Sequence, residues 1–189
     1  MISALSSGKH PNVKFFVFLL TGVLLIGGAV VVGARTLHSV NRTVVPNFDL
    51  ERYMGTWYEI ARFDHSFERG IEAAKACYTL QPDGRVTVEN SGVDARTGEA
   101  RVAHGKAHAT DVPGHLRVSF FWIFYSDYNV MELDPDYRWA LVGSRSPNYL
   151  WILSRTPALP QETLDEILRL ARARGYDTDK LIYVDQSPR

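Results

Sequence analysis

The sequence predicts an all-β domain that is followed by one helix and preceded by a long apolar segment. Three observations support this prediction. From about residue 46 onward, short runs of β-branched and aromatic residues alternate with turn sequences. One amphipathic pattern follows these runs, and residues 15–32 contain no charged side chain. Eight short runs at hairpin spacing are typical of an antiparallel sandwich or an up-and-down barrel.

The predicted strands are separated by turn sequences such as Pro82-Asp83-Gly84 and Asp134-Pro135-Asp136. They cover residues 57–63, 76–80, 86–88, 101–110, 116–120, 128–133, 139–142 and 149–154, and residues 181–184 form a short closing strand. In residues 116–120 apolar and polar side chains alternate, so one face of that strand is expected to be dry. Residues 149–153 are apolar on both faces, which is expected where a helix covers the outer wall of a barrel.

A single helix is predicted after the last long strand. Pro160 suits a helix start, and Gly175 suits the position just past the end. Between them, apolar residues recur at the spacing of one helix face, namely Leu164, Ile167, Leu168 and Ala171. Such a face must be buried against another element, and the outer wall of the β-domain is available to it.

The N-terminal apolar segment is predicted to target or anchor the chain. As a helix, residues 15–32 would extend roughly 27 Å, close to the thickness of a hydrocarbon core. A cleaved signal peptide with small residues at 32–34 is the alternative, but the apolar run is longer than usual for one. We therefore expect a signal or transmembrane segment over 1–34, a linker over 35–47 and a domain over 48–186, lying beyond the inner membrane.

Composition excludes several functional classes. The chain has 189 residues, with 21 Lys and Arg balancing 21 Asp and Glu, so no basic field predicts nucleic-acid binding. Cys77 is the only cysteine, which excludes an intrachain disulfide bond. His104 and His108 would lie roughly 13 Å apart along a strand, too far apart to hold one metal ion. We expect no metal and no cofactor.

Three motifs carry a resemblance to a known family. Residues 55–62 contain a Gly-x-Trp at the start of the first strand, residues 134–142 form a second motif, and residues 153–157 a third. In this order, with the helix after them, they resemble the signatures of the lipocalins. Residues 128–130 and 149–157 are most similar to the bacterial outer-membrane lipocalins, relatives of apolipoprotein D. The signature positions here are Gly55, Trp57, Asp134, Tyr137 and Arg155.

The resemblance implies an eight-stranded antiparallel up-and-down lipocalin barrel with one C-terminal flanking helix. It implies that Trp57 plugs the closed end and that Arg155 lies across its ring, a cation–π contact of about 0.5–2 kcal/mol. It also implies which side chains of each strand face the barrel interior. The resulting candidate lining of a ligand cavity is Ala76, Tyr78, Leu116, Val118, Phe120, Tyr128, Val130, Trp139, Leu141, Trp151 and Leu153.

This lining predicts a carrier or store for a fatty acid or a lysophospholipid that serves membrane lipid maintenance, and not an enzyme. Two alternatives remain open. A membrane-anchored protein-interaction module would have a filled barrel, and the apolar residues 121–125 would then be a dimer contact, a membrane-touching lip or a ligand portal. An enzyme acting on a lipophilic substrate would use Glu59 and Glu132, which the same phase turns inward.

The bacterial relatives differ from this chain in one respect. They usually carry a lipid-modified cysteine just after the apolar run of their signal, and this chain has no cysteine near residue 34. A transmembrane anchor in place of the lipid is therefore the expected membrane attachment, with the barrel in the periplasm or another extracytoplasmic space.

Overall fold

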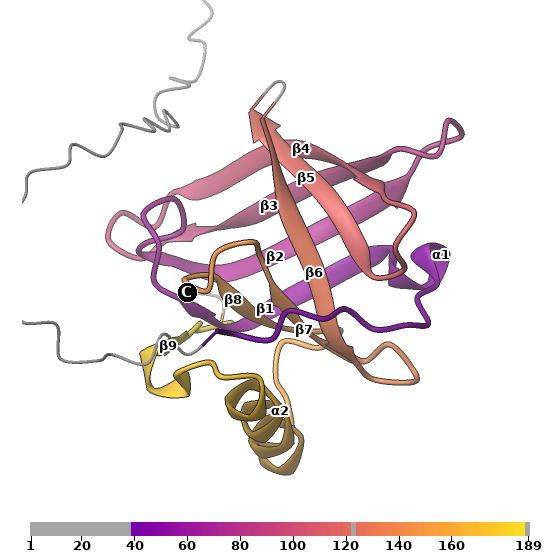
Figure 1. The fold of residues 1–189 in the computed structure, drawn as a ribbon. Helices are drawn as coiled ribbons and strands as arrows, with labels where there is room; N and C mark the ends of the chain where they lie inside the picture. The colour runs from indigo at the N-terminus through magenta and orange to yellow at the C-terminus, as the bar shows by residue number, and fades with distance from the viewer. Residues whose placement is uncertain (1–38, 122–123, 188–189) are drawn as a thin grey trace, which may run out of the picture. The chain divides into compact units, whose positions relative to one another are not determined.

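A computed structural model describes residues 39–121 and 124–187 (Figure 1). The predicted signal or transmembrane segment, residues 1–34, lies outside this range. Among the described residues, no helix is both long and apolar enough to cross a membrane. The described chain forms an antiparallel barrel with two α-helices.

Eight strands make up the barrel. They are β1 (Gly55–Phe63), β2 (Ile71–Leu80), β3 (Val86–Asp94), β4 (Ala100–Ala109), β5 (His115–Phe121), β6 (Phe124–Leu133), β7 (Trp139–Gly143) and β8 (Leu150–Ser154). Each strand pairs with the next along the chain, and β8 pairs with β1. The first half of β1 also pairs with β2, which closes the cylinder. The predicted up-and-down barrel of eight strands is therefore confirmed.

The predicted closing strand forms β9 (Leu181–Tyr183), which follows the short 3-10 helix η1 (Thr178–Lys180). It pairs with residues 61–63 of β1, in the half of that strand that does not pair with β2. The chain beyond β9 then bridges β1 and β2, because Gln186 Nε2 donates to Glu59 O at 2.7 Å and to Ala74 O at 2.8 Å.

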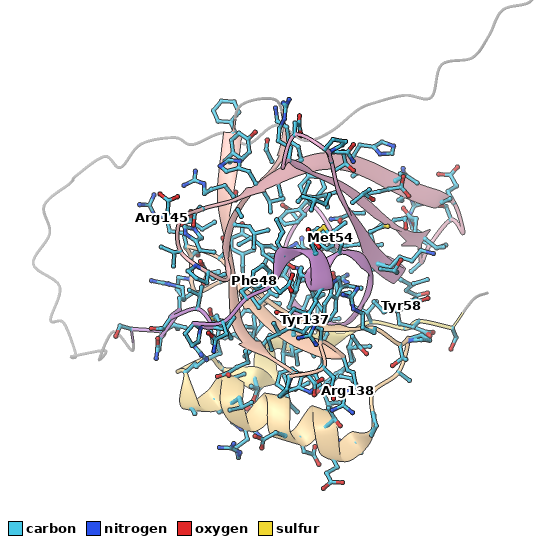
Figure 2. The ribbon with its side chains drawn as sticks, turned by 90° about the vertical axis from the view of Figure 1, so that its right-hand side faces the viewer. Phe48, Met54, Tyr58, Tyr137, Arg138 and Arg145 are labelled. Atoms are coloured by element: carbon cyan, nitrogen blue, oxygen red, sulfur yellow. The ribbon has the colours of Figure 1, made fainter. Side chains whose placement is uncertain are left out.

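The predicted helix is α2 (Gln161–Ala173), which lies on the outside of the barrel (Figures 1 and 2). Ile167 and Ala171 are fully buried, and Leu164 and Leu168 pack against the same cluster. Gly175 follows the helix with a φ of 92°, a conformation that suits glycine at this position. The apolar face predicted from the sequence is therefore the face that packs on the barrel.

A one-turn helix, α1 (Leu50–Tyr53), lies across one end of the barrel (Figure 2). Asp49 caps it, since its carboxylate accepts hydrogen bonds from the backbone amides of Glu51 and Arg52. Tyr53 at its end is fully buried. The sequence does not predict α1, because one turn is too short to show a helical period. The loop between β1 and β2 lies at the opposite end (Figure 1).

Residues 39–47, the described part of the predicted linker, are bonded to the barrel and to α2. Asn41 N donates to Arg174 O at 2.8 Å, and Val45 N donates to Val130 O at 2.9 Å. The Arg174 side chain donates to Thr43 O at 2.8 Å. This part of the chain is consequently a strap on the domain and not a free spacer.

The apolar run 121–125 contributes residues to two strands, and residues 122–123 within it lie outside the described residues. β5 ends at Phe121, β6 begins at Phe124, and these two residues are register partners. The Phe124 side chain is 68% exposed. Phe121 and Phe124 thus lie at adjoining ends of two paired strands.

Candidate ligand-binding site

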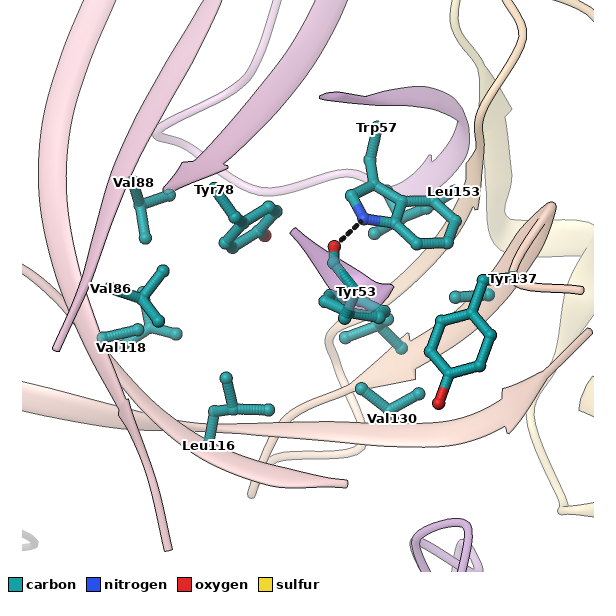
Figure 3. Close-up of a cluster of buried hydrophobic side chains, with 13 residues drawn as sticks. Tyr53, Trp57, Tyr78, Val86, Val88, Leu116, Val118, Val130, Tyr137 and Leu153 are labelled. Atoms are coloured by element: carbon teal, nitrogen blue, oxygen red, sulfur yellow. Dashed lines mark hydrogen bonds between the residues drawn. The ribbon is translucent and has the colours of Figure 1, made fainter. Parts of the chain in front are cut away.

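Two apolar clusters divide the buried side chains. One fills the barrel interior and includes Tyr53, Trp57 and Val130 (Figure 3), and the other lies between the barrel wall and α2. Eight of the predicted lining residues belong to the interior cluster, either as buried members or packed against it: Ala76, Tyr78, Leu116, Val118, Tyr128, Val130, Trp151 and Leu153.

Trp139 and Leu141 lie on the other side of the wall, in the cluster beneath α2. In β7 it is Ala140 and Val142 that face the interior, and both are fully buried. The predicted inward orientation of Trp139 and Leu141 is therefore wrong. Because α2 covers this strand, its outer face is as apolar as its inner face, and alternation cannot distinguish the two faces.

Glu132 also lies outside the barrel, contrary to the predicted phase. The register of β6 against β7 shifts between Val130 and Glu132. The extra residue in this bulge turns the side chains that follow it to the opposite face of the strand. Glu132 accepts a hydrogen bond from Arg174 Nε at 2.8 Å, while Arg174 Nη2 donates to Met131 O at 2.7 Å. The carboxylate ties α2 and the strap to the wall, and it does not meet Glu59 as the enzyme alternative required.

Phe120 lies farther from the closed end than Val118 on the same strand. Its side chain is 43% exposed, and it passes so close to Gly105 that a Cβ atom there would be 2.8 Å from the Phe120 ring. A side chain at residue 105 would collide with this ring, so the glycine leaves room for Phe120 beside β4.

The closed end is formed by the signature residues of the resemblance. Trp57 is fully buried, its indole Nε1 donates to Tyr53 O at 2.8 Å (Figure 3), and the Arg155 guanidinium lies 3.8 Å above its ring. Arg155 also donates to three carbonyl oxygens, those of Arg52, Thr56 and Tyr137. The implied Trp–Arg contact is present, and it joins α1, β1 and the turn before β7.

The other signature residues support this closure. Gly55 has a φ of 91°, and a Cβ atom there would be 3.4 Å from Arg155 Nη1. Asp134 accepts two hydrogen bonds from the Arg138 guanidinium, and this neighbour holds the pKa of the carboxyl below its usual range. The Tyr137 hydroxyl accepts from the backbone N–H of Asp49, which fixes the start of α1.

Three tyrosine hydroxyls meet in the apolar interior. Tyr128 Oη lies 2.7 Å from Tyr53 Oη and 3.1 Å from Tyr78 Oη. Burial raises the pKa of each phenol, that of Tyr78 to about 12, so all three stay protonated at neutral pH. The trio is a neutral polar group among aliphatic side chains such as Val118 and Leu116.

A charged pair on β1 also faces the interior. Glu59 and Arg62 are 6% and 3% exposed, and Arg62 Nη1 donates to Glu59 Oε1 at 2.5 Å. Residues three apart in a regular strand face opposite sides. Here the register of β1 against β8 shifts between Glu59 and Ala61, and this bulge turns both charged residues toward Leu153 and Trp151, their interior partners on β8.

The loop between β1 and β2, residues 64–70, adds two ionisable groups to this pair. Glu68 Oε2 accepts a hydrogen bond from Trp151 Nε1 at 3.1 Å, and it lies 3.1 Å from His65 Nε2. Glu68 O and Ile71 O both accept from Arg62 Nη2. We call Glu59, Arg62, His65 and Glu68 the charged cluster.

The charged cluster contains two carboxylates and one guanidinium. Burial and then the nearby Glu68 carboxylate raise the pKa of Glu59, Arg62 opposes both effects, and the resulting pKa is about 8. A Glu59 side chain with this pKa gains a proton on folding, since an exposed glutamate has a pKa near 4.5.

This proton uptake predicts a particular pH dependence. The contribution of Glu59 to stability is fully present below about pH 4.5 and is lost as the pH rises through its folded pKa of about 8. Relative to Glu59→Gln, the wild-type chain should lose up to about 1.4 kcal/mol of unfolding free energy per pH unit in this window. Urea unfolding at pH 5, 6.5 and 8 measures the difference, and a constant difference would contradict the raised pKa.

Sequence reasoning missed Arg62, His65 and Glu68 as interior groups. Arg62 belongs to the first motif, but in a regular strand it would face away from the interior if Glu59 faces inward. The bulge in β1 turns it inside. His65 and Glu68 lie in a loop without periodicity. The available signal was the predicted inward Glu59, because a buried carboxylate requires a nearby partner.

The residues weighed for other chemistry lie outside the interior. His104 is exposed on β4, where its Nδ1 lies 3.7 Å from Glu89 Oε2. The ring of His108 packs edge-on against Tyr125 with centroids 5.1 Å apart. Cys77 is a half-buried free thiol between the inward residues Ala76 and Tyr78. Within residues 39–121 and 124–187, no group of three ligating side chains could hold a metal ion.

A closed up-and-down barrel with one C-terminal helix and a Trp–Arg contact at its closed end defines the lipocalin class. The sequence model of the family described as the lipocalin-like domain matches residues 48–186. The chain therefore belongs to the lipocalin family. Members of this family bind small hydrophobic ligands and are in general binding and transport proteins.

Particular relatives agree with the predicted resemblance. The chain is 51% identical over 146 residues to the outer membrane lipoprotein Blc of Escherichia coli (strain K12), covering 76% of this chain and 82% of that protein. It is 32% identical over 161 residues to apolipoprotein D of Mus musculus, covering 76% and 80%. The structure of insecticyanin from Manduca sexta has a TM-score of 0.65 at 22% identity, covering 76% and 84%, and shows the shared fold.

Proposed function

We propose that this lipocalin binds a single-chain lipid, a fatty acid or a lysophospholipid, with its acyl chain in the barrel interior. The interior cluster supports this proposal, because its wall is aliphatic and aromatic from Val86 on β3 to Leu153 on β8. Each buried CH₂ group of an acyl chain contributes about 0.8 kcal/mol, so the tail alone provides substantial affinity.

The interior is occupied by side chains around the tyrosine trio, so entry of a tail requires them to move. Tyr78 and Tyr128 lie on opposing strands, β2 and β6, and their ring centroids are 6.1 Å apart. Rotation of these rings toward the wall would lengthen the space between α1 and the charged cluster. Aromatic side chains with few polar partners are typical of a small-molecule pocket.

The proposed place of action is the extracytoplasmic side of a membrane. The relatives with the name outer membrane lipoprotein support a membrane-associated location. We propose that residues 1–34 direct or anchor the chain there, and that the bound lipid is exchanged with that membrane in storage, transport or lipid maintenance.

Native mass spectrometry of the full chain, released from detergent micelles and titrated with palmitic acid or a lysophosphatidylethanolamine, tests the proposal. We expect one lipid per chain. Val118→Trp should weaken binding roughly tenfold or more, because the indole takes the space of the tail. Val102→Trp is the control, since Val102 is 57% exposed on β4. A chain that binds neither lipid, or two variants that bind equally well, would contradict the proposal.

A further inference from the structure

The interior contains charged side chains that binding of an acyl chain does not require. A tail needs apolar walls, whereas the interior contains a guanidinium, an imidazole and two carboxylates, and burying such groups has a large free-energy cost unless they are paired. Arg62 is 3% and His65 is 7% exposed. Arg62 Nε and His65 Nδ1 are buried without a hydrogen-bond partner among the described residues, and the contact of His65 Nε2 is with the Glu68 carboxylate at 3.1 Å.

The members of the charged cluster differ in how they are held. Glu59 and Arg62 belong to the wall of the barrel, as does Trp151 on β8, which donates to Glu68. Glu68 and His65 belong to the seven-residue loop 64–70. The Glu68 carboxylate therefore reaches from the loop to donors of the wall: it lies 3.1 Å from Trp151 Nε1 and 4.0 Å from Arg62 Nε.

The position of this carboxylate is one that a ligand anion could take. With a pKa of about 8, Glu59 is protonated at neutral pH, so Glu68 already balances the Arg62 guanidinium. An anion added beside Glu68 would give this buried site a net negative charge, which is electrostatically unfavourable. An anion that replaces the Glu68 carboxylate leaves the charge of the cluster unchanged. It also offers acceptor oxygens to Arg62 Nε and to His65, and charge-assisted hydrogen bonds of this kind are strong.

A surface depression borders one member of the charged cluster, Arg62. It has a volume of about 290 Å³, lies between loop 64–70, the start of β2 and residues 182–185, and Arg62 is among the residues that line it. At this end β1 pairs with β9 and not with β2, so the wall is closed by the chain terminus and by the loop. Movement of one loop would therefore expose the guanidinium.

We infer that Arg62 and His65 bind the anionic head group of the lipid, a carboxylate or a phosphate, after this head group displaces the Glu68 side chain. This inference rests on the proposed function. The ligand class is then a single-chain amphiphile with a compact negative head. Its tail extends from Arg62 toward the tyrosine trio. Glu68 acts as an internal substitute for the head group that neutralises the site when no lipid is bound.

Calorimetric titration of the full chain with hexadecanoate, 1-hexadecanol and a lysophosphatidylethanolamine tests this assignment. Glu68→Gln keeps the size and the Trp151 acceptor but removes the competing charge, so hexadecanoate should bind roughly tenfold more tightly. The affinity for hexadecanol should stay within about twofold. Arg85→Gln is the matched control, because Arg85 is an exposed arginine paired with Asp83 and does not line the depression.

A second variant keeps the test decisive. Arg62→Gln in a Glu59→Gln background leaves no unpaired Glu59 charge, and it should weaken hexadecanoate roughly tenfold while leaving hexadecanol unchanged. If the affinity for the lysophospholipid falls in parallel, its phosphate binds at the same site. If the affinity falls for only one of the two anionic ligands, the head group of that ligand is the one that Arg62 binds. If acid and alcohol respond alike in both variants, the head-group site is overturned while lipid binding stands. If the wild-type chain binds neither, both proposals fail.

Discussion

Arg62→Met is expected to lower the free energy of unfolding by about 3–5 kcal/mol at pH 8.5, because it leaves a buried carboxylate without its partner. Arg62 Nη1 is the donor that faces Glu59, and Arg62 Nη2 also holds the carbonyl groups of Glu68 and Ile71. The loss should be smaller at pH 6, since Glu59 with a pKa of about 8 is then protonated. Urea unfolding followed by circular dichroism measures both values.

Two control variants separate burial from charge. Arg69→Met removes an exposed arginine of loop 64–70 and should cost no more than about 0.5 kcal/mol. The double variant Glu59→Gln/Arg62→Met should recover part of the loss, because no charge at residue 59 remains unpaired. An Arg62→Met variant as stable as Arg69→Met would show that the charged cluster does not stabilise the barrel as described.

Trp57→Ala is the second substitution with a large expected effect, a loss of about 3–5 kcal/mol. The indole is fully buried, packs against Tyr53 with ring centroids 4.7 Å apart, and lies beneath Arg155. Its removal leaves a cavity at the closed end and frees the guanidinium that joins α1 to β1. Guanidinium chloride unfolding with a tryptophan-independent probe such as far-ultraviolet circular dichroism measures the loss.

Tyr183→Ala provides the comparison for Trp57→Ala. Tyr183 is an aromatic residue of β9 that is 56% exposed, so its truncation should change stability by only about 0.5 kcal/mol. Equal losses for the two variants would mean that the closed end of the barrel is not the tightly packed unit that the Trp–Arg contact implies.

The fold could be predicted because its signals are local and repeated. Turn sequences and β-branched runs mark the eight strands, and the face containing Ile167 and Ala171 marks α2. Alternation alone could predict which way side chains face where one side of a strand meets water, as at Leu116 and Val118. On β7 both sides are apolar because α2 covers the outside, and there the predicted phase is wrong at Trp139 and Leu141.

The candidate site depended on features that leave no periodic signal. Bulges near Ile60 and Met131 reverse the facing of Arg62 and Glu132, and a bulge is set by the pairing of neighbouring strands, not by the residues of one strand. His65 and Glu68 approach the wall through a loop, and their contacts depend on the closed barrel. Sequence reasoning therefore predicted most of the apolar part of the interior but only Glu59 of its charged part.

A crystal structure of the full chain with palmitic acid would show where the acyl chain and its carboxylate bind. We expect one acyl chain inside the barrel, in contact with Val118 and Val130, with its carboxylate at Arg62 and the Glu68 side chain moved away. An acyl chain bound only on the outer wall, or an interior still filled by the tyrosine trio at saturating lipid, would contradict this expectation.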